Sequence, residues 1–195
     1  MNRATLARYV TEGASVLNCF SYTGAFGVYA AAASAGRVVN VDSSADALAL
    51  AGTNWETNFG ADRTEGTDGT RVEFVCADAF DDVRARRKNG EQFDVVILDP
   101  PKFAHNLGQI DRAARAYKDL NRVGLALVRP GGILTTFSCS GVVSPDLFQK
   151  IIFSAAIEAK RDAQIVEKLS QASDHPILLT FPESEYLKGL VCRVG

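Results

Sequence analysis

Five short segments of the chain carry side chains that can do chemistry, and most of them follow an apolar run. A cysteine stands between two serines in "SCS" (138–140), and an aspartate precedes two prolines in "DPP" (99–101). Asp42 and Asp78 follow two further apolar runs, and the glycine-containing segment "NCFSYTGAFG" (18–27) follows the first one. A thiol can act as a nucleophile, and carboxylates can hold or move protons. These segments therefore indicate a chemical site, provided that the fold brings them together.

Apolar runs of strand length alternate with segments of helical period along the first 160 residues. Each parallel strand needs a crossover connection, so five strand–helix repeats predict an α/β fold with helices on both faces of the sheet. Two final strands without an intervening helix predict a C-terminal β-hairpin, giving a mostly parallel, seven-stranded sheet. The expected strands are 15–20, 37–42, 71–78, 93–99, 133–138, 163–169 and 186–194, and the expected helices are 24–35, 43–59, 79–90, 109–128 and 144–160. We expect "RPGG" (129–132) to close the fourth helix, and 60–70 to form a polar loop.

Length and composition predict one globular domain. The 195 residues are 47% hydrophobic and 23% charged, and no apolar run reaches the roughly 18 residues of a membrane helix. We expect a lead-in segment at 1–14 and the domain proper at 15–195. The start of the sequence has no apolar export signal, which predicts a cytoplasmic protein without membrane contact.

Charge and cysteine spacing exclude other classes of function. A net charge of −2 argues against a chain built mainly to grip a polyanion. The basic stretch "RARRK" (84–88) and the group Arg112, Arg115 and Lys118 are local exceptions, for which a solvated helix face is the commoner outcome. The four cysteines are widely spaced, so neither a metal site nor a disulfide framework is expected. Cys19, Cys76 and Cys192 lie in or at the end of apolar runs, which predicts that they are buried.

The glycines and the first two acids fit a nucleoside-containing cofactor. Gly24 and Gly27 allow a ligand to approach the backbone at a strand–helix turn, although the segment is not the G-x-G-x-x-G of dinucleotide sites. Asp42, eighteen residues after Gly24, is placed to accept bonds from ribose hydroxyls. Asp78 could accept from the exocyclic amine of adenine. A helix N-cap is an equally good interpretation of either acid alone. In this order they predict an adenosine cofactor without a diphosphate, such as S-adenosylmethionine.

The segment "LDPPKF" (98–103) ends the fourth expected strand. Its two prolines remove two backbone donors and fix a stiff, extended turn whose carbonyls can meet a flat substrate. A purely structural turn is the alternative. An acid followed by Pro-Pro at this place is typical of enzymes that transfer methyl groups to bases.

Eight segments together resemble a known family over nearly the whole chain, from about residue 5 to the end. They are "VLNCFSYTGAFG", "VNVDSS", "ADAF", "ILDPPKF", "AYKDLN", "LTTFSCSG", "DHP" and "YLKG". The chain is similar to the bacterial 23S ribosomal RNA cytosine-C5 methyltransferases of the large-subunit methyltransferase I type. The resemblance implies the Rossmann-like class I methyltransferase fold, S-adenosylmethionine as cofactor and ribosomal RNA as partner. Full-length members carry an RNA-binding PUA domain and a linking domain upstream, so this chain would correspond to their catalytic domain.

The resemblance also implies roles for individual residues. The cofactor would lie against Phe20, Tyr22, Thr23, Gly24 and Asp99, with Asp42 on the ribose and Asp78 near the adenine. The target base would lie against Asp99, Pro100, Pro101, Lys102 and Phe103, and Cys139 would be the nucleophile. Many RNA cytosine-C5 enzymes carry a second cysteine at the position that Lys102 occupies here. The acceptor of the carbon-5 proton is therefore left open between Lys102 and water.

The chemistry of cytosine explains why a thiol would be needed. Carbon 5 is a weak nucleophile until a thiolate adds to carbon 6, which is covalent catalysis of the usual kind. Asp99 would stabilise the protonated ring nitrogen during this attack. An ordinary thiol, with a pKa of about 8.5, is mostly protonated at neutral pH, so the site must activate it. Of the two histidines, His105 is expected to be solvated and His175 to border the site from a turn.

Three alternatives remain open from the sequence. Cys139 could be an inert packing thiol, which is the usual fate of a free cysteine. The Pro-Pro segment could serve methylation of an exocyclic amine, as in adenine-N6 enzymes, although Lys102 stands where their aromatic residue belongs. The domain could also be a cofactor-binding or dinucleotide-binding module without catalysis. Both a monomer and a homodimer are compatible with the sequence.

Overall fold

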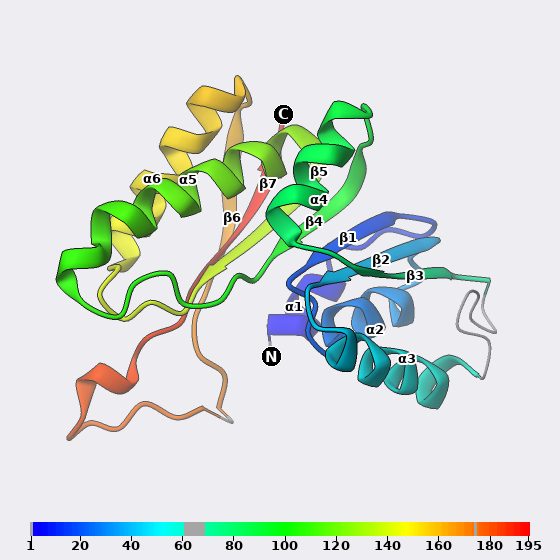
Figure 1. Cartoon of the computed structure of the whole chain (residues 1–195), viewed down its shortest axis with the longest axis horizontal. Helices are drawn as coiled ribbons and strands as arrows, with labels where there is room; N and C mark the ends of the chain where they lie inside the picture. Colours follow the sequence, from blue (N-terminus) through cyan, green and yellow to red (C-terminus); the bar gives the residue numbers. More distant parts are fainter. Residues whose placement is uncertain (1, 61–68, 174) are drawn as a thin grey trace.

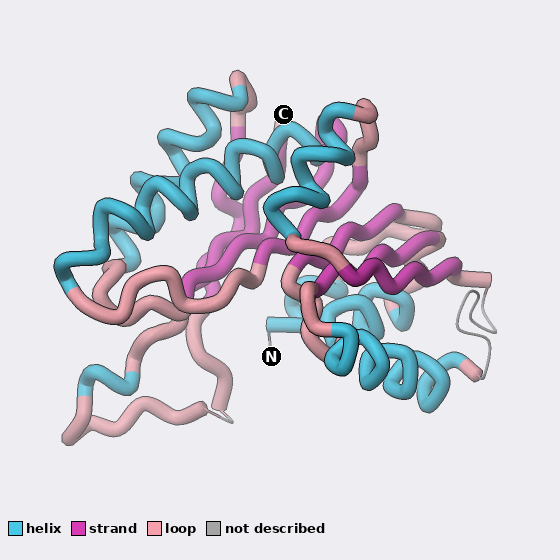
Figure 2. Tube along the Cα trace, viewed as in Figure 1, coloured by secondary structure: helices cyan, strands magenta, loops and turns pink. Residues whose placement is uncertain are grey.

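Seven strands form one sheet in the order β3-β2-β1-β4-β5-β7-β6 (Figures 1 and 2). The structure, a computed structural model, describes residues 2–60, 69–173 and 175–195, so most of the predicted loop 60–70 lies outside the described residues. The strands are β1 Ser15–Cys19, β2 Arg37–Asp42, β3 Arg71–Cys76, β4 Phe93–Leu98, β5 Val128–Ser138, β6 Ala163–Leu169 and β7 Lys188–Val194. The first five pair in parallel, and β7 is antiparallel to both β5 and β6. The predicted mostly parallel sheet and its C-terminal antiparallel pair are confirmed.

Helices cover both faces of this sheet, as predicted. They are α1 Asn2–Ala7, α2 Ala25–Ala32, α3 Ala45–Phe59, α4 Ala79–Lys88, α5 Ile110–Leu127 and α6 Pro145–Ala159. Helices α1 to α3 lie on one face and α4 to α6 on the other (Figure 1). Successive strand residues point to opposite faces, so Val16 joins the core under α1 to α3 and Leu17 joins the core under α4 to α6. The carboxyl ends of β1 to β5 therefore lie along one edge, where ligands of such folds bind.

Strand β5 begins five residues earlier than predicted, and "RPGG" lies inside it. Val128 already pairs with Phe93, and the register shifts before the next pair, Val95 with Ile133. Gly131 has a φ of 82°, and a Cβ on Gly132 would lie 2.6 Å from the carbonyl oxygen of Asp94. The prediction of a helix-closing turn was wrong because these glycines allow an irregular bulge within the strand instead.

Two of the three cysteines predicted to be buried are buried. Cys19 and Cys192 have exposed fractions of 0% and 1%. Cys76 is exposed, because β3 lies at the edge of the sheet and most of its residues are only partly covered. The prediction for Cys76 was wrong, since an apolar run does not reveal whether its strand is central or at an edge.

Two segments outside the strand–helix repeats complete the carboxyl edge. Helix α1 packs beside α2 and buries Leu6, which places the start of the chain against the domain. The connection between β6 and β7, described for residues 170–173 and 175–187, extends away from the sheet as a long arm (Figure 1). Among the helices that the structure describes, none combines the length and the hydropathy needed to cross a bilayer.

Candidate active site

At the end of β5, the side chain of Cys139 lies in a different environment from those of its neighbours Ser138 and Ser140. Ser138 and Ser140 are fully buried, and both are hydrogen-bonded to the hydroxyl of Tyr117 on α5. The Ser138 Oγ donates to that hydroxyl at 2.9 Å, and the Ser140 Oγ lies 3.1 Å from it. Cys139 between them is half-buried. The serines thus fix the backbone from inside while the thiol faces the carboxyl edge.

The same network joins the β5 turn to the segment after β4. The backbone N–H of Ala104 donates to the Ser140 Oγ at 3.2 Å. On the other side, the Cys139 thiol donates to the carbonyl oxygen of Pro100 at 4.0 Å. Hydrogen bonds therefore connect the "DPP" and "SCS" segments, which were predicted to share a site.

We expect Tyr117→Phe to destabilise the protein by about 1–3 kcal/mol, because two buried serine hydroxyls lose their shared partner. Urea denaturation, followed by far-UV circular dichroism, measures the change in the free energy of unfolding. Tyr29→Phe on the exposed side of α2 is the matched control and should leave stability unchanged. A loss below about 0.5 kcal/mol in Tyr117→Phe, the range of ordinary surface changes, would contradict this role for the network.

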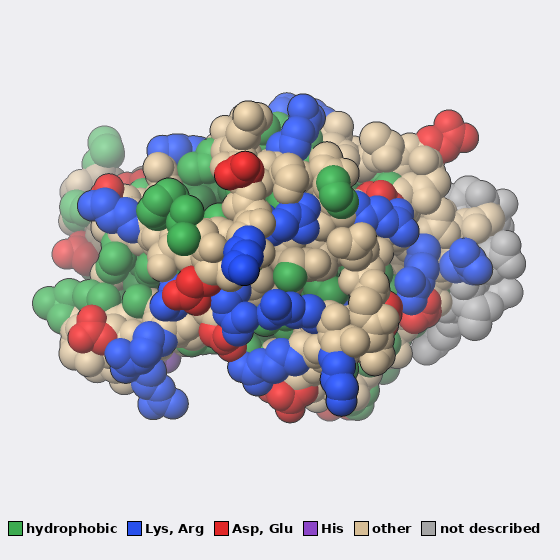
Figure 3. Space-filling view, turned by 90° about the horizontal axis from the view of Figure 1, so that it is seen from above, with side chains coloured by type: hydrophobic (Ala, Val, Ile, Leu, Met, Phe, Trp, Pro, Cys, Tyr) green, Lys and Arg blue, Asp and Glu red, His purple; other side chains and the backbone are tan. Residues whose placement is uncertain are grey.

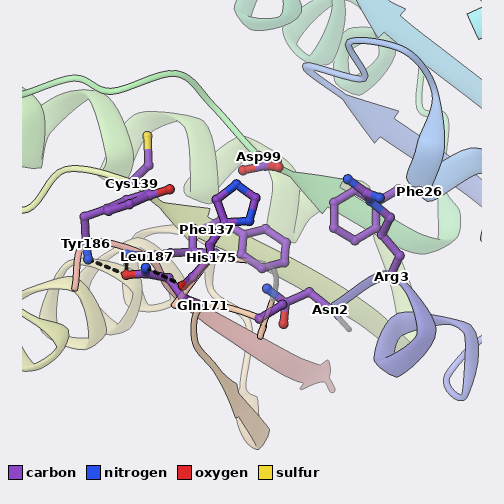
Figure 4. A pocket seen from close by; sticks show the side chains of 11 residues that line it. Asn2, Arg3, Phe26, Asp99, Phe137, Cys139, Gln171, His175, Tyr186 and Leu187 are labelled. Atoms are coloured by element: carbon purple, nitrogen blue, oxygen red, sulfur yellow. Dashed lines mark hydrogen bonds between the residues drawn. The ribbon is translucent and has the colours of Figure 1, made fainter. Parts of the chain in front are cut away.

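Asp99 and Cys139 line one cavity of about 290 Å³. In Figure 4 it extends from Cys139 and Tyr186 at one end, past Asp99 and His175, to Arg3 and Phe26 at the other. Its walls come from α1, α2, the ends of β4 and β5, and the arm. The lining residues are Asn2, Arg3, Phe26, Asp99, Phe137, Cys139, Gln171, Ala172, His175, Tyr186 and Leu187.

Burial governs the electrostatics of this cavity. It raises the pKa of Asp99 to about 6, against the opposing charge of Arg3. Burial, and then the charge of Asp99, also raise the pKa of the Cys139 thiol, while Lys102 and Lys188 act to lower it. The thiol is therefore mostly protonated at neutral pH in the free protein, and Asp99 titrates closer to neutrality than a solvated carboxyl. A carboxyl of this kind can exchange a proton with a bound base.

The predicted cofactor turn has an unusual backbone. Phe20 and Tyr22 have φ values of 58° and 48°, and Gly24 has a φ of 73°. Left-handed backbone at non-glycine residues costs free energy and is concentrated at ligand sites. Asp42 holds the turn, because its two carboxylate oxygens accept from the backbone N–H groups of Tyr22, at 2.8 Å, and Ser44, at 2.9 Å.

Asp78 is the N-cap of α4, one of the two interpretations that the sequence left open. Its Oδ1 accepts from the N–H groups of Phe80, at 2.8 Å, and Asp81, at 3.1 Å. The side chain is exposed at the same edge as Asp42. A carboxylate has about four acceptor positions, so a cap of this kind leaves room for a ligand donor.

An aromatic row connects the cofactor turn with the β5 turn. The ring of Phe80 lies 6.0 Å from that of Phe20 and 5.9 Å from that of Phe103, measured between centroids. Phe103 continues to Tyr117 at 4.6 Å. Phe103, which the resemblance placed against the substrate, is thus half-buried among these rings, whereas Pro101 and Lys102 are exposed.

The structure brings only part of the predicted site into the cavity. Asp99 and Cys139 line it, and the carbonyl of Pro100 reaches the thiol. The predicted cofactor residues other than Asp99 lie at the ends of β1, β2 and β3, where the carbonyl of Thr23 accepts from Asn54 on α3. His175 borders the cavity as expected. Four residues of the site and its surroundings were not predicted: Arg3, Tyr117, Tyr186 and Lys188. The last three lie within "AYKDLN" and "YLKG", two of the segments that carry the family resemblance.

Some basic residues of the helical face are paired with acids, and others, such as Arg112 and Arg115, are exposed to solvent. Arg84 binds Asp119 at 2.6 Å and Lys118 binds Glu158 at 2.7 Å. Figure 3 shows Lys and Arg side chains dispersed over this view, with acids among them. The solvated helix face is the interpretation that fits. Among residues 2–60, 69–173 and 175–195, no group of three His, Cys, Asp or Glu side chains is arranged to hold a metal.

Comparison with known proteins gives a consistent result at the level of sequence. Residues 3–192 match the family described as S-adenosylmethionine-dependent methyltransferase. Proteins named ribosomal RNA large subunit methyltransferase I, from Shewanella denitrificans and Aeromonas hydrophila, are each 53% identical to this chain. The matches cover 99% and 98% of this chain but 47% and 46% of the relatives. The chain thus spans about half the length of the curated relatives it matches.

Solved structures agree with the fold. A methyltransferase crystallised in complex with S-adenosylhomocysteine superimposes with a TM-score of 0.80 at 26% identity, over 98% of this chain and 48% of that one. A methyltransferase from Streptococcus mutans gives a TM-score of 0.81, also at 26% identity, over 98% of this chain and 47% of its own.

Proposed function

The chain belongs to the family of S-adenosylmethionine-dependent methyltransferases, and we propose that it methylates carbon 5 of a cytosine in large-subunit ribosomal RNA. One observation carries the choice of reaction: Cys139 and Asp99 line the same cavity. Methylation of an exocyclic amine needs no thiol at that place. The names of the relatives support ribosomal RNA as the substrate.

The residues at the ends of β1 to β3 fit S-adenosylmethionine by their chemistry. The left-handed turn Phe20 to Gly24 exposes backbone next to Asp42, whose oxygens have further acceptor capacity for ribose hydroxyls. Asp78 offers a second exposed acceptor for an adenine amine. We propose that Thr23 contacts the cofactor through the same turn. When bound, S-adenosylmethionine supplies an electrophilic methyl group and leaves as S-adenosylhomocysteine.

We expect Asp42→Asn to weaken S-adenosylhomocysteine binding about tenfold, equivalent to about 1.4 kcal/mol. An amide removes one acceptor for the ribose and turns an N–H₂ group toward a backbone N–H of the turn. Isothermal titration calorimetry measures the dissociation constant. Asp46→Asn, an exposed acid in the first turn of α3, is the matched control and should bind normally. Equal affinity in both variants would remove Asp42 from the cofactor site.

Cys139 and Asp99 divide the work on the base between them. The Cys139 thiolate forms a bond from its Sγ to carbon 6, and the displaced electron pair makes carbon 5 nucleophilic. Asp99, with its raised pKa, holds the proton that ring nitrogen 3 needs as negative charge develops on the ring. After carbon 5 is methylated, Lys102 or water accepts the carbon-5 proton. The Sγ–carbon 6 bond then breaks with its electron pair returning to sulfur, the carbon 5–carbon 6 double bond is restored, and Asp99 takes back the proton of ring nitrogen 3.

The base must leave the RNA stack to reach Cys139. Enzymes that act on a base take it into a pocket, and the cavity walls supply flat apolar groups such as Phe26 and Tyr186. We propose that the exposed residues Pro101 and Lys102 guide the nucleotide toward Cys139, and that buried Pro100 contributes through its carbonyl, which accepts from the Cys139 thiol. The domain 15–195, completed by α1, would act in the cytoplasm, where ribosomal RNA is made and assembled.

Nucleoside mass spectrometry tests the proposed reaction. Unmodified large-subunit ribosomal RNA is incubated with the protein and S-adenosylmethionine carrying a labelled methyl group, then digested to nucleosides. We expect the label in 5-methylcytidine. Label in N6-methyladenosine would support the exocyclic-amine alternative, and S-adenosylhomocysteine binding without any transfer would support a non-catalytic module.

A further inference from the structure

Lys188 is a buried lysine whose hydrogen bonds go to the turn that carries Cys139. Its residue is 8% exposed, and it is paired with Ser138 in the antiparallel register of β5 and β7. The Nζ donates to the carbonyl oxygen of Ser140 at 2.6 Å and to that of Val143 at 2.7 Å. One ammonium group thus binds two carbonyls of the segment that directly follows Cys139 in the chain.

A buried ammonium costs free energy that an apolar side chain of similar size would not. Burial accordingly lowers the pKa of Lys188 to about 8, which still leaves the group mostly protonated at pH 7. Its charge interacts with Cys139, and the cation acts to lower the pKa of the thiol. An ammonium has three N–H donors and the two carbonyls use two of them. Lys188 therefore holds the backbone next to Cys139 by hydrogen bonds and also places a positive charge near the thiol.

We propose that Lys188 is a positioning residue for Cys139: it fixes the turn 139–143 by its two hydrogen bonds, and its charge favours the thiolate. The inference rests on the proposed function of Cys139 as the nucleophile. When the thiolate forms, the S–H bond breaks, its electron pair stays on sulfur and the proton passes to solvent. At pH 7 Lys188 is still mostly protonated, because its pKa is about 8, and its charge stabilises the thiolate that this step forms.

Other charged or titratable groups also face Cys139, and they set the size of the effect. Asp99 opposes the thiolate and Lys102 favours it. Tyr117 approaches from α5 and couples weakly to the same sulfur. The remaining titratable groups of the cavity wall are Arg3, His175 and Tyr186. Lys102 lowers the pKa of the thiol more than Lys188 does, but Lys102 is exposed, so water and salt screen its charge, whereas Lys188 is buried.

The test measures the reactivity of the thiol without RNA or cofactor. Cys139 is alkylated with iodoacetamide from pH 6 to pH 10 in a Cys76→Ala background, and the modified peptide is quantified by mass spectrometry. Cys19 and Cys192 are buried and react slowly. We expect Lys188→Met to lower the alkylation rate at pH 7, where Lys188 is mostly protonated, about tenfold, the ratio that corresponds to one unit of thiol pKa. Lys188→Arg, which keeps the charge, should stay within about threefold of the parent, half a unit of pKa.

A second variant separates the effect of the Lys188 charge from the effect of its hydrogen bonds to the Ser140 and Val143 carbonyls. Lys188→Gln keeps an N–H donor for the carbonyls but has no charge, so it should show the same displaced pH profile as Lys188→Met. It also serves where Lys188→Met fails to fold, as judged by its thermal midpoint and by S-adenosylhomocysteine binding. An unchanged pH profile in a folded Lys188→Met or Lys188→Gln protein overturns the proposal.

Failure of the inference about Lys188 can be distinguished from failure of the proposed role of Cys139. If Cys139→Ala still methylates RNA, the nucleophile assignment fails, whatever the alkylation profiles show. If the profiles are unaffected by Lys188 while Cys139→Ala is inactive, the inference about Lys188 alone fails.

Discussion

Replacing Cys139 by alanine is expected to lower the rate of RNA methylation by about 10⁴-fold or more, as for other catalytic nucleophiles. Without the Sγ no bond to carbon 6 forms, and carbon 5 stays too weak a nucleophile to take the methyl group. Cys139→Ser should be nearly as inactive, because a serine hydroxyl is far less acidic than a thiol. Single-turnover transfer of a labelled methyl group to ribosomal RNA measures the rate.

The loss must belong to chemistry and not to folding. Cys139→Ala leaves the hydrogen bonds of Ser138 and Ser140 to Tyr117 in place, so its thermal midpoint and S-adenosylhomocysteine affinity should match the parent. Cys76→Ala is the matched control, because that thiol is exposed on the edge strand, and it should remain fully active. Methylation by Cys139→Ala within tenfold of the parent would contradict a covalent mechanism.

The pH dependence of the parent follows from the same thiol. Burial and Asp99 raise the pKa of Cys139 above its ordinary value, so the thiolate fraction still increases through pH 8 and pH 9. The protonated fraction of Asp99, whose pKa is about 6, falls over the same range. Because the proposed reaction needs the thiolate and the protonated carboxyl together, we expect the methylation rate at low RNA concentration to stay nearly level over this range, while the rate of Cys139 alkylation rises.

Asp99→Asn is expected to lower the methylation rate by about 10²–10³-fold, because an amide cannot hold the proton of ring nitrogen 3. The turnover number should fall more than the affinity for RNA, since the interaction strengthens as the ring becomes charged. Single-turnover rates at several RNA concentrations separate the two quantities. Asp146→Asn, an exposed acid in the first turn of α6, is the matched control. A rate within threefold of the parent would exclude Asp99 from the chemistry.

The same substitution should make the protein more stable at neutral pH. The folded pKa of Asp99 is about 6, above its ordinary value of 3.8, so the folded state binds more protons between these two pH values. Stability is therefore lost as pH rises from about 4 to 6, and the full cost persists at pH 7. Asn carries no charge, so we expect Asp99→Asn to gain about 1–3 kcal/mol at pH 7 and nothing near pH 3. Urea denaturation at the two pH values measures this difference.

The sequence was sufficient for the parts of the fold that depend on local pattern. Alternating strand and helix periods gave the parallel sheet, and the acids at the strand ends gave the edge where Asp42, Asp78 and Asp99 lie. The predicted start of β5 was wrong. Val128 pairs with Phe93 of β4, and this tertiary contact overrides the turn that Pro130 and the two following glycines would favour locally.

The cavity itself depends on contacts between distant parts of the chain. Arg3 reaches it from α1, and Tyr186 reaches it from the arm, both far in sequence from Asp99. Lys188 meets Ser140 only because β7 inserts beside β5 in the sheet. Such long-range placements have no local pattern, whereas the N-cap at Asp78 was foreseeable from its position before α4.

The central claim is that Cys139 bonds to the target cytosine, and RNA containing 5-fluorocytosine tests it most directly. Fluorine at carbon 5 leaves no proton to remove after methylation, so the Sγ–carbon 6 bond cannot break and the complex is trapped. We expect a cofactor-dependent adduct that survives denaturation and that peptide mass spectrometry locates at Cys139. If RNA that is methylated in its ordinary form gives no adduct once fluorinated, or gives one at another cysteine, the proposed mechanism is wrong.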